Sequence, residues 1–84
     1  MQRDIIKADG TSKLTEVGEG FASWNSILDI RTGELVISPD ETIELWCDEN
    51  GLCVSEPQLN EAASLLVGRQ IVGDVIVFYP GDVQ

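Results

Sequence analysis

The side chains that could do chemistry in this chain of 84 residues are mostly carboxylates. Histidine is missing, so the chain has no copy of the commonest general base, and neither a Ser-His-Asp nor a Cys-His arrangement can form. Two pairs of neighbouring carboxylates remain, Asp40 with Glu41 and Asp48 with Glu49. Both fall in expected turns, where solvation opposes the perturbed pKa values that catalysis needs. We therefore expect a protein that is not an enzyme, and we name no catalytic residue.

Two stretches resemble ligand-binding loops but lack essential positions. The segment Gly18–Ser23 imitates the glycine pattern of a phosphate loop, but Ser23 replaces the third glycine and Glu19 would repel a phosphate. A flexible connection into a helix explains it better. The acidic run 48–51 resembles part of a calcium loop, but Leu52 occupies a position that needs a ligand oxygen. The sequence thus predicts no cofactor and no metal ion, with loose divalent binding as a minor alternative.

Cys47 and Cys53 are the only cysteines, and without histidine they cannot complete a usual structural zinc site within one chain. If three residues, 49–51, form the loop between them, the two cysteines lie opposite each other and a cross-strand disulfide is conceivable. A loop of only Asn50 and Gly51 would break that alignment. In a reducing cytoplasm, two buried thiols are the expected state.

The charge is strongly negative, because 15 acidic residues stand against 5 basic ones, for a net charge of −10. Such a chain does not bind nucleic acid through its backbone phosphates. The stretch between Arg31 and Arg69 holds no basic residue and carries these carboxylates: Glu34, Asp40, Glu41, Glu44, Asp48, Glu49, Glu56 and Glu61. They form either a solvated face that keeps a small protein soluble or a negative surface for a basic partner.

The elements that must position these residues belong to one domain, residues 1–84, since 43% hydrophobic content suffices for a single modest core. Residues 4–8 and 13–17 are expected to form a hairpin around an Asp-Gly turn. Helical spacing of Phe21, Trp24, Ile27 and Leu28 predicts a helix that ends before residue 32.

Residues 34–38 are expected to form a strand that stops at the Pro39-Asp40 turn, and residues 42–47 are expected to form a half-buried antiparallel strand. In the second strand Ile43, Leu45 and Cys47 would face the core, while Trp46 would point to the other side. Either a second layer covers Trp46, or Trp46 is an exposed anchor for a partner. The Asn-Gly pair at 50–51 then predicts a turn into a short return strand, 52–54.

The second helix has two predicted starts, a capping box at Ser55 and a simple N-cap at Asn60. With either start Leu59, Ala62, Ala63 and Leu66 share a face, and Gly68 can end the helix. Residues 75–79 are the most β-prone run and predict a central strand, closed by Pro80-Gly81. The expected fold class is α+β, with a small antiparallel or mixed sheet of about five strands packed with two short helices.

The run Leu59-Asn60-Glu61-Ala62-Ala63-Ser64-Leu65-Leu66-Val67-Gly68, followed by Ile71-Val72-Gly73-Asp74-Val75-Ile76-Val77, resembles the C-terminal half of a small phage and bacterial family, domain-of-unknown-function family 3846. The resemblance covers roughly residues 4 to 79 and is specific over about 59 to 77. It implies a small α+β domain carried on phages and mobile elements, and it implies no activity, cofactor or catalytic residue.

Two functional hypotheses follow. The first is an interaction module, phage-encoded or mobile-element-encoded, that binds a host or phage protein and could inhibit a nucleic-acid-handling enzyme by imitating DNA charge. Its expected partner-binding residues are Asp40, Glu41, Glu44, Trp46, Asp48 and Glu49. The alternative is an accessory domain that self-associates, as a homodimer for example, and whose acidity serves solubility. The first residues fit neither a signal peptide nor a membrane span, so we expect a cytoplasmic protein without membrane contact.

Overall fold

The computed structural model describes residues 2–50 and 58–79, which form five strands and two helices. In chain order these are β1 (Gln2–Ile6), β2 (Ser12–Glu16), α1 (Phe21–Leu28), β3 (Gly33–Ile37), β4 (Glu44–Asp48), α2 (Glu61–Val67) and β5 (Val75–Phe78). Every strand pairing is antiparallel. The α+β class is thereby confirmed, with a purely antiparallel sheet.

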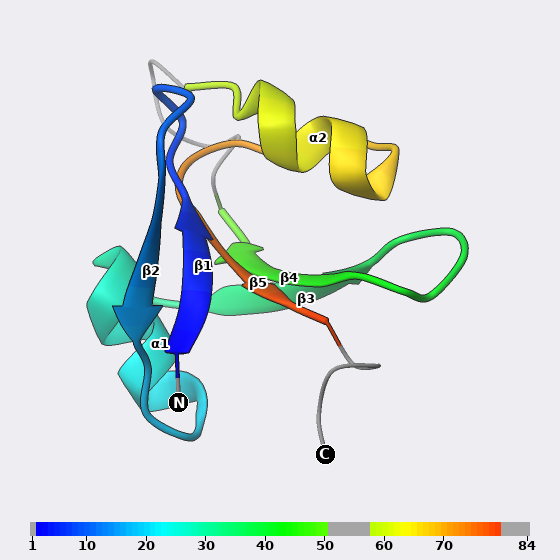
Figure 1. The fold of residues 1–84 in the computed structure, drawn as a ribbon. Helices are drawn as coiled ribbons and strands as arrows, with labels where there is room; N and C mark the ends of the chain where they lie inside the picture. Colours follow the sequence, from blue (N-terminus) through cyan, green and yellow to red (C-terminus); the bar gives the residue numbers. More distant parts are fainter. Residues whose placement is uncertain (1, 51–57, 80–84) are drawn as a thin grey trace.

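The sheet has the order β2-β1-β5-β4-β3, so the last strand in sequence lies between two hairpins (Figure 1). The β1–β2 hairpin runs across the direction of the β3–β4 hairpin, which shows how strongly the sheet twists. Val75, Ile76 and Val77 of β5 are each fully buried, because both faces of the central strand are covered. The predicted central strand is confirmed.

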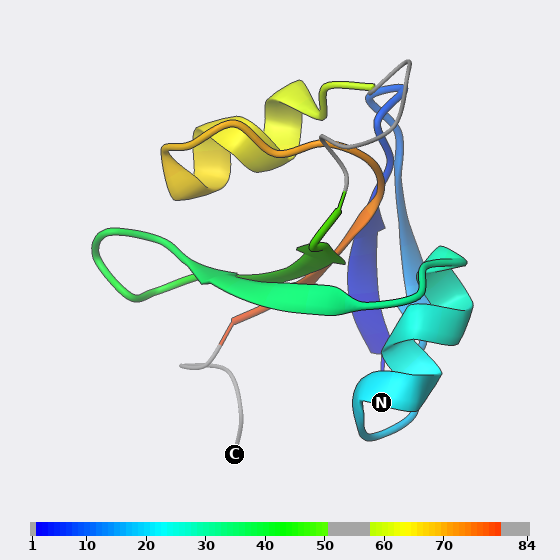
Figure 2. The ribbon, with the colours of Figure 1, turned by 180° about the vertical axis from the view of Figure 1, so that it is seen from behind.

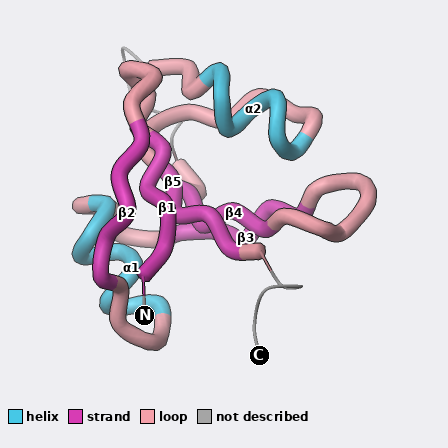
Figure 3. Tube along the Cα trace, in the orientation of Figure 1, coloured by secondary structure: helices cyan, strands magenta, loops and turns pink. Residues whose placement is uncertain are grey.

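The two helices cover opposite faces of the sheet (Figure 2 and Figure 3). Side chains that alternate along β4 and β5 divide between the faces: Leu45 and Val77 belong to the cluster under α2, whereas Trp46 and Ile76 belong to the cluster with α1. The α2 cluster is the larger one. The α1 cluster is completed by partly buried side chains, namely Trp24, Leu28, Ile30 and Phe78.

Local signals place one turn and both ends of α2 where the sequence predicts them, although β1 lies two residues earlier than the predicted strand 4–8 and β4 begins two residues later than the predicted strand 42–47. Gly10 adopts a φ of 93° in the β1–β2 turn, a conformation that glycine tolerates at little cost. Asn60 is the N-cap of α2, and its side chain accepts a hydrogen bond from the backbone N–H of Ala63 at 3.0 Å. Gly68 ends α2 in the left-handed conformation, as predicted.

The predicted buried face of α2 is partly wrong. Leu59 precedes the helix and forms a β-bridge with Val72, and Ala62 is exposed. The buried helical positions are Ala63 and Val67, three and seven residues after Asn60. Asn60 is 1% exposed and donates from Nδ2 to the carbonyls of Ile6 and Gly73, so it sets the side of α2 that faces the sheet.

The predicted helix at Phe21 is confirmed, but its apolar face is less buried than expected. Trp24 and Leu28 pack against the core, whereas Phe21 is 63% exposed and Ile27 is 37% exposed. The helix spans only eight residues and covers part of one sheet face. The predicted return strand 52–54, the capping box at Ser55 and the closing Pro80-Gly81 lie outside the described residues.

Candidate functional site

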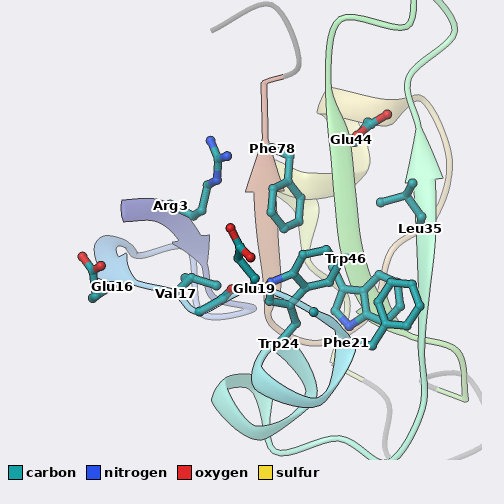
Figure 4. Close-up of a pocket in the computed structure, with 12 residues that line it drawn as sticks. Arg3, Glu16, Val17, Glu19, Phe21, Trp24, Leu35, Glu44, Trp46 and Phe78 are labelled. Atoms are coloured by element: carbon teal, nitrogen blue, oxygen red, sulfur yellow. Dashed lines mark hydrogen bonds between the residues drawn. The ribbon is translucent and has the colours of Figure 1, made fainter. Parts of the chain in front are cut away.

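The face of the sheet that carries α1 contains a groove of about 570 Å³ (Figure 4). It lies between the start of α1, the connection from β2, and the middle strands of the sheet. We call it the aromatic groove, and its lining consists of Arg3, Glu16, Val17, Gly18, Glu19, Gly20, Phe21, Trp24, Leu35, Glu44, Trp46 and Phe78. Residues from both ends of the chain and from both hairpins thus meet in one place.

Four aromatic rings form a continuous series along this groove. The ring of Phe21 stacks on that of Trp46 at a centroid distance of 4.7 Å and an interplanar angle of 6°. Trp24 meets Trp46 edge to face at 5.2 Å and tilts against Phe78 at 4.9 Å. Each such pair contributes about 0.5–1.5 kcal/mol beyond the burial of its area. The rings therefore stabilise one another in a fixed arrangement that is present before any ligand arrives.

Hydrogen bonds and one glycine hold the two indoles in place. Nε1 of Trp46 donates to Oδ1 of Asn25 at 2.8 Å, and Nε1 of Trp24 donates to the carbonyl oxygen of Gly18 at 3.0 Å. A Cβ on Gly33 would overlap the indole of Trp46, so only glycine leaves room for the ring there. Because the rings are already oriented, a ligand would bind without the entropic cost of ordering them.

The charged side chains of the groove are three carboxylates, Glu16, Glu19 and Glu44, and one guanidinium, that of Arg3. Cζ of Arg3 lies 5.2 Å from the centroid of the Phe78 ring, a cation–π geometry. Figure 4 shows Glu44 next to Leu35 on one side of the rings, with Arg3 and Glu16 on the other side. By its chemistry this lining suits apolar side chains and positive charge, whereas the carboxylate of Glu19 would repel a phosphate.

The interpretation of Trp46 as an exposed anchor is wrong. Its side chain is 5% exposed and forms the floor of the aromatic groove. The alternative interpretation, in which a second layer covers it, is confirmed, because α1 packs on that face and supplies Phe21, Trp24 and Asn25 around the ring.

The predicted acidic residues do not form one compact patch. Asp40 and Glu41 lie in the β3–β4 turn, whereas Asp48 and Glu49 lie at the other end of β4. Four residue steps along the strand, about 13 Å, separate Glu44 from Asp48. Of the predicted carboxylates only Glu44 lines the aromatic groove.

Two of these carboxylates have local partners in turns. The side chain of Asp40 accepts hydrogen bonds from the hydroxyls of Ser38 at 2.7 Å and Thr42 at 2.8 Å, which lower its pKa below the usual value. Asp48 accepts from the backbone N–H of Asn50 at 2.9 Å. Both side chains therefore stabilise the ends of the β3–β4 hairpin.

Cys47 is buried on the α2 side of β4, and burial raises the pKa of its thiol to about 11. A thiol with such a pKa is a poor nucleophile and metal ligand at neutral pH. The predicted alignment with Cys53 lies outside the described residues. Within residues 2–50 and 58–79, no group of three or more His, Cys, Asp or Glu side chains is placed to hold a metal ion.

Sequence reasoning missed most of the groove. The sequence pattern places Phe21 on one face of a helix and Phe78 in a β-prone run, and it gives Arg3, Glu16 and Glu19 no shared role. Their positions along the chain give no sign of proximity, because β1 and β5 meet through pairing of residues more than 70 apart, such as Ile5 with Ile76. The one usable signal was the pair of glycines around Glu19, which marks the connection that borders the groove.

No helix among the described residues is long and apolar enough to cross a membrane. Comparison with known proteins finds no family model that matches the chain, and no curated protein or solved structure that is similar to it. The resemblance of residues 59–77 to the domain-of-unknown-function family 3846 therefore stays a prediction.

Proposed function

We propose that this protein is an interaction module that binds a segment of another protein in the aromatic groove, and that the segment carries both apolar and basic side chains. The observation that carries the proposal is the composition of the groove: four ordered aromatic rings, with three carboxylates and one guanidinium, on a chain of net charge −10. Aromatic rings are the side chains that most often anchor interfaces, and their quadrupoles also attract Lys and Arg.

A peptide fits this groove better than the other ligand classes. A nucleic acid or nucleotide would bring phosphates toward Glu16, Glu19 and Glu44. The groove continues onto exposed apolar side chains, with Phe21 63% exposed and Leu35 46% exposed, so its binding surface extends beyond an enclosed small-molecule cavity. The negative charge would also accelerate the encounter with a basic partner at low salt.

A charge-reversal experiment tests where the partner binds. The ligand is a peptide of about eight residues, a typical strand length, that alternates Lys or Arg with Val or Phe. We expect Glu19→Lys/Glu44→Lys to weaken binding about five- to thirtyfold at low salt, since each exposed charge pair is worth about 0.2–1 kcal/mol and reversal also adds repulsion. Isothermal titration calorimetry supplies the affinities.

The matched control is Glu41→Lys/Glu49→Lys, which changes the net charge equally, from −10 to −6 because each reversal adds two, at sites outside the aromatic groove. This control should bind the peptide within about twofold of the wild type at the same salt. If the control loses binding as much as the groove variant does, general acidity drives association and the groove is not the site. If no basic peptide binds the folded protein, the proposed function is wrong.

Self-association is the second candidate function, and the observation that favours it is the pair of sheet edges, β2 and β3, that lack a strand neighbour among the described residues. Sedimentation velocity at high micromolar concentration distinguishes the candidates, because a single monomeric species contradicts self-association.

The first proposal has two narrower versions. One is a phage or mobile-element origin, which the resemblance over residues 59–77 supports, and the other is inhibition of a nucleic-acid-handling enzyme. The latter requires that a basic enzyme compete with the peptide.

A further inference from the structure

The outer edge of β3 presents main-chain groups that have no strand partner among the described residues. Two backbone hydrogen bonds flank the β3–β4 pairing, from N–H of Ser38 to the carbonyl of Ile43 and from N–H of Glu49 to the carbonyl of Thr32. In an antiparallel ladder, hydrogen-bonded and non-hydrogen-bonded pairs alternate.

The register between these two bonds therefore fixes which backbone groups point outward. Glu34 and Val36 pair with Cys47 and Leu45 and direct their main-chain groups toward β4. Gly33, Leu35 and Ile37 are the alternating positions, so the N–H and C=O of these three residues point away from the sheet. They provide the donors and acceptors that an added strand needs.

The same edge has an exposed apolar face that runs into the aromatic groove. The side chains of Leu35 and Ile37 are 46% and 47% exposed, and both lie opposite residues of the α1 face of β4, namely Trp46 and Glu44. Leu35 also lines the groove. A strand placed against β3 would thus bring every second side chain beside Leu35 and the rings.

Charge distinguishes this edge from the opposite one. The β3–β4 hairpin, residues 33–50, contains six carboxylates and no Lys or Arg. At the other edge β2 carries Lys13 in its interior, a residue type that discourages strand addition, and its partner strand carries Arg3. The β3 edge has no Lys or Pro within the strand, and its one charged residue, Glu34, forms an ion pair with Arg69 at 3.8 Å. Pairing of β3 with a second copy would bring two such acidic hairpins together, so the charges favour a basic partner.

We propose that the partner segment binds as a sixth strand along the outer edge of β3, with one set of its alternate side chains on the α1 face beside Leu35, Glu44 and the aromatic groove. This inference rests on the proposed function and adds the mode of binding, which is β-strand addition. It also specifies the ligand pattern, because side chains alternate between the two faces of a strand. Binding then depends on main-chain groups of β3 as well as on the groove.

Backbone methylation of the ligand tests this mode while leaving its side chains and charge unchanged. The probe is the alternating basic peptide, prepared in two forms, each with N-methyl groups on one of the two sets of alternate residues. One set faces β3 in a paired strand and the other faces solvent. We expect one form to bind at least about tenfold more weakly than the other, from the loss of several hydrogen bonds that each contribute a factor of about two to ten. Equal affinity of both methylated forms and the unmethylated peptide would overturn strand addition.

A proline variant tests the same contact from the side of the protein. Leu35→Pro removes the outward N–H without removing a bond to β4, and proline is tolerated at such edge positions. The reference is Leu35→Ala, which keeps the N–H and loses the side chain as well. We expect Leu35→Pro to bind the peptide about three- to tenfold more weakly than Leu35→Ala, with circular dichroism showing that both fold. Equal binding by the two folded variants would contradict strand addition but would be compatible with binding in the groove. If the peptide does not bind the wild type at all, the proposed function itself is refuted.

Discussion

Gly33→Ala probes the packing that forms the floor of the aromatic groove. The backbone of Gly33 does not require positive φ, so alanine is conformationally acceptable there and only space is lacking. The added Cβ would overlap the indole of Trp46, and both residues lie on paired strands that cannot separate easily. The indole must therefore tilt, which disturbs its 2.8 Å bond to Asn25 and its stacking on Phe21.

The expected loss of stability follows from these contacts. Overpacking costs about 1–3 kcal/mol, a weakened hydrogen bond about 0.5–1.5 kcal/mol, and the lower entropy of the unfolded alanine chain offsets about 0.4–1 kcal/mol. The central values give a net loss of about 2 kcal/mol, within a range of about 0.5–4 kcal/mol, and this is a large part of the roughly 4–12 kcal/mol expected for a domain of this length. The melting temperature should fall by about 10–20 °C.

Urea unfolding followed by circular dichroism measures this loss, and a double-mutant cycle identifies its cause. In a Trp46→Leu background the ring is gone, so Gly33→Ala should cost less than about 0.5 kcal/mol. The proposed packing would be refuted if Gly33→Ala alone were neutral, or if it destabilised the Trp46→Leu background by the full amount.

Three further predictions concern the scaffold. Asn60→Ala should lower the free energy of unfolding by about 2–4 kcal/mol, because it removes the cap of α2 and the amide group that donates to two main-chain carbonyls. A loss below about 1 kcal/mol in urea unfolding would contradict that role. In a Cys53→Ser variant, alkylation of Cys47 at pH 8 should occur only as fast as the protein opens. Since folding raises the pKa of this thiol from 9.0 to about 11, the unfolded state loses the proton first and stability should fall as pH rises through that range. Asp40→Asn should destabilise the protein at neutral pH, because the stabilising contribution of Asp40 needs the ionised carboxylate. In acid unfolding curves, the difference in stability between this variant and the wild type should vanish as pH falls through the lowered pKa of Asp40.

Local signals in the sequence predicted the elements well, because each rests on residues close in the chain. The Asp-Gly turn, the Asn60 cap and the Gly68 end depend on side chains and φ angles within a few positions, and all three are present. The β-branched run of β5 predicted its central place because a strand buried on both faces requires apolar residues at every position.

The candidate site could not be predicted in the same way, because it depends on pairing between distant segments. Alternation in β4 placed Trp46 and Leu45 on opposite faces of the sheet, but it did not reveal which element covers the face that carries Trp46. The insertion of β5 between the two hairpins brings Phe78 to the same groove as Arg3 and Phe21. Charge runs in the sequence indicated turns whose carboxylates do not line the groove, because residues that are close in the sequence of the hairpin need not share one surface.

The most direct test of the central claim is a chemical-shift map of the ¹⁵N-labelled protein titrated with the alternating basic peptide. The chain has two tryptophans, and both indole N–H groups lie at the aromatic groove. Both indole signals should shift together with the backbone amides of Phe21 and Leu35, while the amides around the exposed Leu65 of α2 stay in place. Shifts confined to the acidic turns, or to α2, with unchanged indole signals would contradict the claim that the groove is the binding site.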